Sequence, residues 1–171
     1  MFLHKNKKRG TTLIEVLMTL VIVSFLFIVT WTAYNKSSRT QELTVAALQA
    51  EDVINQARQM AYAPNAAGGK TVQGYCFQFD RGIAARWTVG EMESATSASG
   101  DCAGAKVVSA GNLPSYSNLV CTQCGATFAV GNTTTKGMPQ ISSDLKFNVI
   151  HTKTQKNKSV LLNKSGIVDV Y

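Results

Sequence analysis

An almost uninterrupted apolar segment near the amino terminus constrains the fold of this chain more than any other feature. Residues 11–34 read TTLIEVLMTLVIVSFLFIVTWTAY, and Glu15 is the only charged residue among them. A helix of this length spans about 35 Å, which is enough to cross a hydrocarbon core of about 30 Å. Trp31 and Tyr34 stand at its far end, where aromatic rings favour the membrane–water interface. The segment therefore predicts one membrane-spanning helix over residues 11–34.

The positive charge of the chain is concentrated before this segment. The net charge is +7, and four of the basic residues lie within residues 5–9. Basic residues next to an apolar span stay on the cytoplasmic side of a membrane. The charge therefore predicts a cytoplasmic amino terminus, with the rest of the chain outside the cytoplasm, in preference to a DNA-binding arm.

Two simpler interpretations of the apolar segment are a cleaved secretory signal and a plain signal anchor. A secretory signal has an apolar core of about 7–15 residues, which is shorter than this segment. A plain signal anchor accounts for the length and the basic flank, but it does not account for Glu15. A carboxylate in an apolar span costs about 2.5–3.5 kcal/mol at mid-span and less near the edge. We therefore expect Glu15 to have a partner.

The residues before Glu15 suggest what that partner is. The stretch KKRGTTLIE, residues 7–15, resembles the processing site of type IV prepilins and type II secretion pseudopilins, in which a basic leader ends in Gly and Glu is the fifth residue of the mature chain. The resemblance implies that a prepilin peptidase cuts between Gly10 and Thr11 and then methylates the new amine of Thr11. Family members usually have Phe at this position, so Thr11 departs from the family pattern.

The same resemblance implies a role for Glu15 in filament assembly. After cleavage, the cationic amine of Thr11 lies at the membrane depth of a neighbouring subunit's Glu15. Pairing the two charges offsets the cost of burying each and sets the axial register between subunits. A lone carboxylate without a second acid or a histidine is a poor basis for acid–base catalysis. We therefore predict that the protein is not an enzyme and has no catalytic residue, metal or cofactor.

Residues 40–62 are predicted to continue the helix as an amphipathic segment. Apolar residues recur there at spacings of three and four, and the apolar stripe is rich in alanine. Pro64 and the Gly68-Gly69 pair end the segment. The predicted organisation is a leader at 1–10, a transmembrane helix at 11–34, an amphipathic continuation at 35–63 and a β-rich head at 70–171.

The head is predicted from short runs of β-favouring residues. These runs cover residues 71–79, 83–89, 106–110, 118–121, 126–130, 144–151, 159–162 and 167–171, and small polar residues at 91–105 predict a loop. The turn Asn163-Lys164-Ser165-Gly166 predicts a hairpin with a positive φ at Gly166. The predicted class is α+β, a pilin-like fold with a long N-terminal helix packed on a small antiparallel sheet. The final hairpin, together with Ala57-Arg58, is similar to GspH/FimT-type minor pseudopilins and pilins.

Four cysteines lie in the predicted head, at Cys76, Cys102, Cys121 and Cys124. An even number in an oxidising location predicts two disulfides, and of the three connectivities we favour Cys76–Cys102 with Cys121–Cys124. The CxxC spacing of the second pair also occurs in zinc sites and in thioredoxin-like redox centres. Those alternatives call for a second CxxC or for a helix after the motif, whereas β-like residues follow here.

A lysine-rich stretch near the carboxyl terminus bears on possible partners. Lys153, Lys156 and Lys158 lie in a predicted exposed loop that begins at His151. Their ammonium groups can bind DNA phosphates, and the alternative is an ordinary solvated loop. His4 and His151 stand too far from other ligands along the chain to suggest a metal site.

The leading functional prediction is a minor pilin or pseudopilin, a structural or initiating subunit of a type IV pilus-like filament that serves a pilus, type II secretion or competence. The expected partners are the prepilin peptidase, other pilin subunits and the inner-membrane assembly platform. The expected location is the inner membrane, crossed once, with the head outside the cytoplasm. The alternatives are a DNA-binding minor pilin acting in DNA uptake and a signal-anchored protein that forms no filament.

Overall fold

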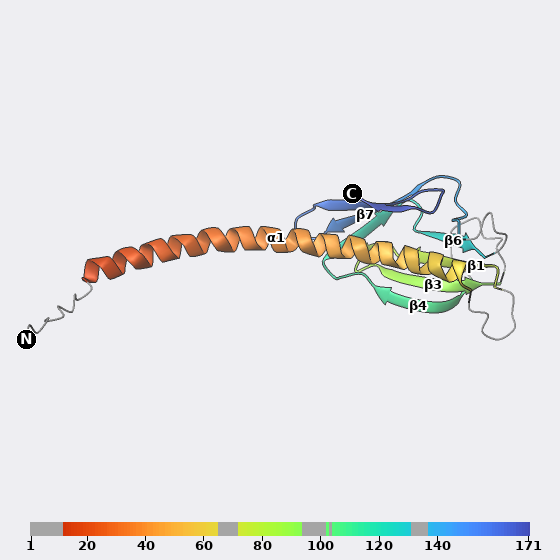
Figure 1. The fold of residues 1–171 in the computed structure, drawn as a ribbon, viewed down its shortest axis with the longest axis horizontal. Helices are drawn as coiled ribbons and strands as arrows, with labels where there is room; N and C mark the ends of the chain where they lie inside the picture. The colour runs from red at the N-terminus through yellow and green to blue at the C-terminus, as the bar shows by residue number, and fades with distance from the viewer. Residues whose placement is uncertain (1–11, 65–71, 94–101, 103, 131–136) are drawn as a thin grey trace, which may run out of the picture. The chain divides into compact units, whose positions relative to one another are not determined.

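The structure, a computed structural model, describes residues 12–64, 72–93, 102, 104–130 and 137–171. The chain divides into two compact units, Met1–Ser38 and Arg39–Tyr171. Helix α1, Leu13–Tyr62, contributes its first half to the first unit and its second half to the second. The described strands all belong to the second unit, which is the head (Figure 1).

The first half of α1 is exposed on all sides. Every residue from Leu13 to Tyr34 is exposed, and the helix contains a window of mean hydropathy 2.6, so its length and composition suffice to cross a membrane. Hydroxyl groups in this half bond to the helix itself: Thr19 Oγ1 donates to the Val16 carbonyl at 2.8 Å, and Ser24 Oγ donates to the Leu20 carbonyl at 2.7 Å. These hydroxyl groups therefore add little to the free energy of placing the helix in an apolar surrounding.

The second half of α1 buries the predicted apolar stripe. Its buried residues recur at spacings of three and four, and they are Leu43, Ala46, Ala47, Ala50, Val53, Ile54, Ala57 and Ala61. Five of these eight are alanine. Small side chains let the helix backbone approach the strands closely, and larger residues from the sheets fill the space beside it.

Nine strands in the described residues form two antiparallel sheets. The four-stranded sheet has the order β4-β3-β1-β6, with β1 Gly74–Phe79, β3 Arg86–Met92, β4 Lys106–Asn112 and β6 Gly125–Ala129. The five-stranded sheet has the order β2-β5-β7-β8-β9, with β2 Gly82–Ile83, β5 Ser117–Cys121, β7 Leu145–His151, β8 Asn157–Leu162 and β9 Val168–Val170. Together with the long helix, these sheets confirm the predicted α+β, pilin-like class.

An aromatic cluster joins the two sheets in the core of the head. Phe77 and Phe79 come from β1, and their ring centroids lie 5.9 and 5.6 Å from that of Phe147 on β7. Phe77 and Phe147 are fully buried. Edge-on and tilted aromatic contacts of this kind stabilise a core beyond the area that they bury. The core therefore lies where both sheets meet the buried stripe of α1.

Two strand predictions differ from the structure. The run predicted at 83–89 is two strands in different sheets, because a turn at Ala84, with φ of 51°, separates β2 from β3. The loop predicted from residue 91 begins too early, since β3 continues to Met92, which is buried, and Glu91 pairs with Lys106. Most of the remaining predicted loop lies outside the described residues.

The final hairpin has the predicted turn. Gly166 has a φ of +81°, a conformation that glycine adopts without a steric penalty. Its N–H donates to the Asn163 carbonyl at 2.9 Å, and Asn163 Oδ1 accepts from the N–H of Ile167 at 2.9 Å. The Asn side chain thus completes a turn whose shape depends on the glycine.

Candidate functional site

Glu15 lies in the first turn of α1, on an exposed apolar surface. Its backbone N–H donates to the Thr12 carbonyl at 3.0 Å, as does that of Val16 at 3.3 Å. A carboxylate in the first turn is stabilised by the positive end of the helix dipole. Gly10 and Thr11, the predicted cleavage site and methylated amine, lie outside the described residues.

A counter-ion for Glu15 has to come from outside this helical segment. Among the residues after Glu15, the first Lys or Arg is Lys36. That separation corresponds to about 31 Å of helix, several times the range of an ion pair. A cationic partner, which the sequence predicts for Glu15, would therefore come from the residues before it or from another chain.

The structure forms both of the disulfides favoured from the sequence. Cys76 on β1 is bonded to Cys102 across a separation of 26 residues, and Cys121 is bonded to Cys124 across a separation of 3. A cysteine in a disulfide has no thiolate to offer a metal ion, so the zinc alternative lacks its ligands. Gly125 begins strand β6 and not a helix, which removes the thioredoxin-like alternative as well.

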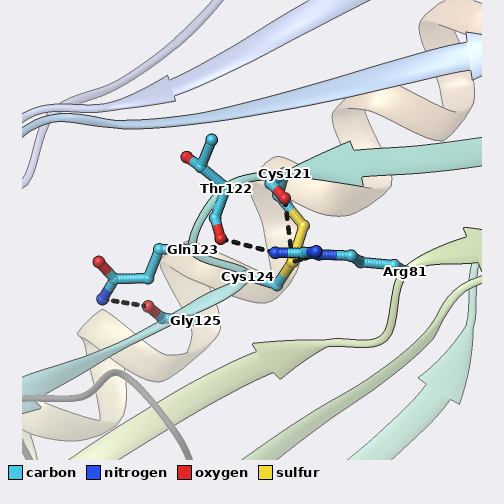
Figure 2. Close-up of a disulfide and its surroundings, with 6 residues drawn as sticks. All are labelled: Arg81, Cys121, Thr122, Gln123, Cys124 and Gly125. Carbon is cyan, nitrogen blue, oxygen red and sulfur yellow. Dashed lines mark hydrogen bonds between the residues drawn. A yellow bond between two sulfur atoms is a disulfide. The ribbon is translucent and has the colours of Figure 1, made fainter.

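The Cys121–Cys124 bridge lies where the chain passes from one sheet to the other (Figure 2). Cys121 ends β5 of the five-stranded sheet, and Gly125 begins β6 of the four-stranded sheet. Arg81 lies in a second connection between the sheets, from β1 of the four-stranded sheet to β2 of the five-stranded sheet. Its side chain donates hydrogen bonds to the connection that contains the bridge. Its Nη2 donates to the Thr122 carbonyl at 2.7 Å, and its Nε donates to Cys124 Sγ at 3.4 Å. The bridge and the bonds from Arg81 therefore hold the β1–β2 and β5–β6 connections against each other.

The two disulfides are expected to differ in their contribution to stability. A disulfide stabilises the folded state by lowering the entropy of the unfolded chain. From the loop lengths, this stabilisation is about 3.5 kcal/mol for Cys76–Cys102 and about 2 kcal/mol for the much shorter Cys121–Cys124 loop. We expect Cys76→Ala with Cys102→Ala to lower the free energy of unfolding of the head more than Cys121→Ala with Cys124→Ala. Urea unfolding of the detergent-solubilised chain, followed by near-ultraviolet circular dichroism, measures both. A larger loss in the second double variant would contradict the entropic account.

The three candidate DNA-binding lysines differ in exposure and in the element that carries them. Lys153 and Lys156 are exposed on the turn between β7 and β8. Lys158 is only partly exposed and lies in β8 opposite Val149, on the face of the strand that also carries the buried Val160. Alternate residues of a strand point to the same face, so Lys158 shares a face of β8 with the buried Val160, whereas Lys153 and Lys156 are exposed on the turn.

The environment of His151 differs from the one that the sequence predicts. The sequence predicts His151 at the start of an exposed loop, but its side chain is 1% exposed, and its Nε2 lies 3.0 Å from Oε2 of Glu42 on α1. The missed signal is the β7 alternation, since His151 continues the inward-facing series Leu145, Phe147 and Val149. Glu42 on α1 is 39% exposed and is the partner of this buried ring.

The hydrogen bonds of His151 determine its tautomer. Its Nδ1 accepts from the backbone N–H groups of Lys153 at 3.2 Å and Thr154 at 3.3 Å. The proton of the neutral ring is therefore on Nε2, which donates to Glu42. The Tyr116 ring stacks on the imidazole with centroids 5.9 Å apart. Burial, and then the negative charge of Glu42, raise the pKa of the Tyr116 hydroxyl, which stays neutral at physiological pH.

Comparison with known families bears on the amino-terminal residues. The family model for the prokaryotic N-terminal methylation motif matches residues 5–31, the part of the chain that contains Gly10, Thr11 and Glu15. The match supports a type IV pilin-like chain that is processed by a prepilin peptidase and assembles with other pilins. No curated protein and no solved structure matches the chain.

Proposed function

We propose that this chain is a minor pilin or pseudopilin, a structural or initiating subunit of a type IV pilus-like filament. The observation that carries the proposal is the position of Glu15. It is an acid in the first turn of an exposed apolar helix, inside a match to the N-terminal methylation motif. A membrane anchor alone has no use for such an acid, because the charge raises the cost of insertion.

In the proposed mechanism, the peptidase cuts after Gly10 and methylates Thr11 while the chain is in the inner membrane. The chain crosses that membrane once and keeps its head outside the cytoplasm. The amine of Thr11 in one subunit then pairs with Glu15 in another, and the exposed apolar surfaces of the two helices pack together. The large apolar side chains that are exposed between Leu13 and Tyr34 supply that packing surface. The assembly platform and other pilin subunits are the proposed partners, and the protein performs no catalysis of its own.

A minor role of the GspH/FimT type is the proposed subclass. Its support is the last hairpin around Gly166, which packs near Arg58 towards the end of α1: a Cβ atom placed on Gly166 would lie 3.5 Å from Arg58 Nε. This brings together the two sequence features on which that similarity rests. Pilus, type II secretion and competence filaments are equally compatible with these features.

DNA uptake through the lysine-rich turn has less support than filament assembly. Lys153 and Lys156 are exposed, as phosphate binding requires, but Lys158 is only partly exposed, on the face of β8 that carries the buried Val160. Two lysines neutralise few phosphates, and affinity for DNA rises with the number neutralised. We therefore place the DNA-binding alternative second.

Subunit counting in purified filaments tests the minor role. We expect the chain to copurify with sheared filaments and to be present at a small fraction of the major subunit. Mass spectrometry with isotope-labelled peptides from the head measures that ratio. Absence from filaments of a strain that expresses the chain would contradict filament assembly, and a ratio near one would contradict the minor role alone.

A further inference from the structure

The turn between β7 and β8 lies at one identifiable end of the head. His151 begins this turn and bonds to Glu42, whereas the next turn, between β8 and β9, carries Gly166 beside Arg58. Glu42 and Arg58 are 16 positions apart on α1, which corresponds to about 24 Å of helix. The His151 turn therefore lies at the end of the head that follows the apolar segment most closely along the chain.

The His151 turn is held in one conformation by its own hydrogen bonds. The N–H of His151 donates to the Lys156 carbonyl at 2.8 Å, and the N–H of Gln155 donates to the His151 carbonyl at 2.9 Å. Thr152 Oγ1 donates to the Tyr116 carbonyl at 3.1 Å, and the buried imidazole accepts the two N–H groups at the tip of the turn. The exposed lysines thus project from a preorganised turn, which lowers the entropic cost of binding through them.

Three cations with exposed side chains lie on this turn or one helical turn from Glu42, which bonds to it. Lys153 and Lys156 are on the turn, and Arg39 precedes Glu42 by three residues, one helical turn away on α1. The carboxylate of Glu42 is engaged by the imidazole N–H and is the acid that the structure places against the turn. Tyr116 stays neutral. Arg39, Lys153 and Lys156, here termed the basic collar, therefore present net positive charge.

The basic collar is tethered close to the apolar segment. Eight residue steps separate Tyr34, at the end of that segment, from Glu42. A helical chain of that length measures about 12 Å, and Arg39, the first residue of the collar, is only five steps from Tyr34, or about 7.5 Å, which is within the Debye length of about 8 Å at physiological ionic strength. A connection of this length is short enough for the collar to reach the surface in which the apolar segment ends.

We propose that the basic collar binds the anionic head groups of the membrane that the apolar segment crosses. The inference rests on the proposed membrane insertion and is independent of filament assembly. The negative charge of a membrane surface raises the binding constant by about fivefold for each Lys or Arg near it. Three such residues hold the head against an anionic leaflet, which orients the subunit before it leaves the membrane. His151 is a positioning residue in this scheme, because it shapes the turn that carries both lysines of the collar.

The test uses the full chain reconstituted in vesicles, with a fluorophore attached to a cysteine introduced as Gln155→Cys. Quenching by a head-group quencher reports the ratio of docked to undocked heads. We expect vesicles with about 30% phosphatidylglycerol to raise that ratio by about 100-fold over pure phosphatidylcholine, and about 0.5 M salt to remove most of the gain. Lys153→Ala with Lys156→Ala is expected to lower the ratio in the anionic vesicles by about 25-fold.

Lys164→Ala is the matched control for this experiment. Lys164 is also exposed, but it lies on the turn at the opposite end of β8, so its loss is expected to leave docking unchanged. Equal docking on neutral and anionic vesicles, or an equal loss in Lys164→Ala, would overturn the proposal. Displacement of the docked turn by a short DNA duplex at physiological salt would also overturn it and assign the turn to nucleic acid. Failure of the chain to cosediment with the vesicles would instead refute membrane insertion and, with it, the proposed function.

Discussion

Replacing Glu15 with alanine is expected to leave the chain in the membrane but to lower its incorporation into filaments by at least about 100-fold. The physical reason is that removing one member of a buried ion pair leaves the other charge uncompensated, at a cost of about 3–5 kcal/mol. Here the uncompensated charge is the amine of Thr11 on the neighbouring subunit. Membrane insertion is expected to improve, because the apolar span loses its only acid. The measurement is the amount of chain in the sheared filament fraction relative to the amount in the membrane fraction.

Two further variants separate the charge of Glu15 from other properties of α1. Glu15→Gln keeps the size of the side chain and removes its charge, so it is expected to behave like the alanine variant. Asp52→Asn removes an exposed carboxylate from the second half of the same helix and is expected to assemble normally. Filament incorporation of both Glu15 variants at the level of the unmodified chain would show that Glu15 has no counter-ion in the filament.

Replacing Gly10 with valine is expected to stop processing. Glycine lacks a side chain and lets a protease approach the backbone closely, and a branched residue at the bond removes that access. A displacement of about 1 Å from the reactive geometry can cost about 100-fold in rate. We therefore expect the membrane fraction to contain the unprocessed chain, which retains its basic leader and lacks the amine needed for assembly. Comparison of the processed and unprocessed forms by intact-mass analysis measures the effect.

The Thr11→Phe variant is the control for the Gly10 experiment. It restores the residue that the family usually has after the cut, so processing and assembly are both expected to continue. Normal cleavage of Gly10→Val, or failure of both variants to the same degree, would contradict the assignment of the cleavage site.

The fold class was predictable because hydrophobic periodicity carries most of the information on secondary structure. The alternation of Leu145, Phe147 and Val149 identified β7, and the spacing of the alanine-rich stripe identified the buried face of α1. The assignment of strands to two sheets was not predictable in this way. Short runs such as Gly82–Ile83 carry no signal that tells which sheet they join, and the turn at Ala84 has no glycine to mark it.

The candidate site is recognisable from the sequence where its residues are neighbours, whereas contacts between residues far apart in the sequence were missed. Glu15 is recognisable because the acid, the apolar span and the basic leader are contiguous. The bond between Glu42 and His151 joins residues 109 positions apart, and the bonds from Arg81 to the Cys121–Cys124 turn span more than 40 positions. Such pairs depend on how the sheets pack, which local patterns do not specify.

Cleavage after Gly10 is the step from which assembly through Glu15 follows, and the mass of the native chain measures it most directly. The chain purified from its own membrane is expected to begin at Thr11 and to be about 14 Da heavier than the unmodified fragment, as one methyl group requires. A native chain that still begins at Met1 would contradict the account, because no free amine would then be available to pair with Glu15.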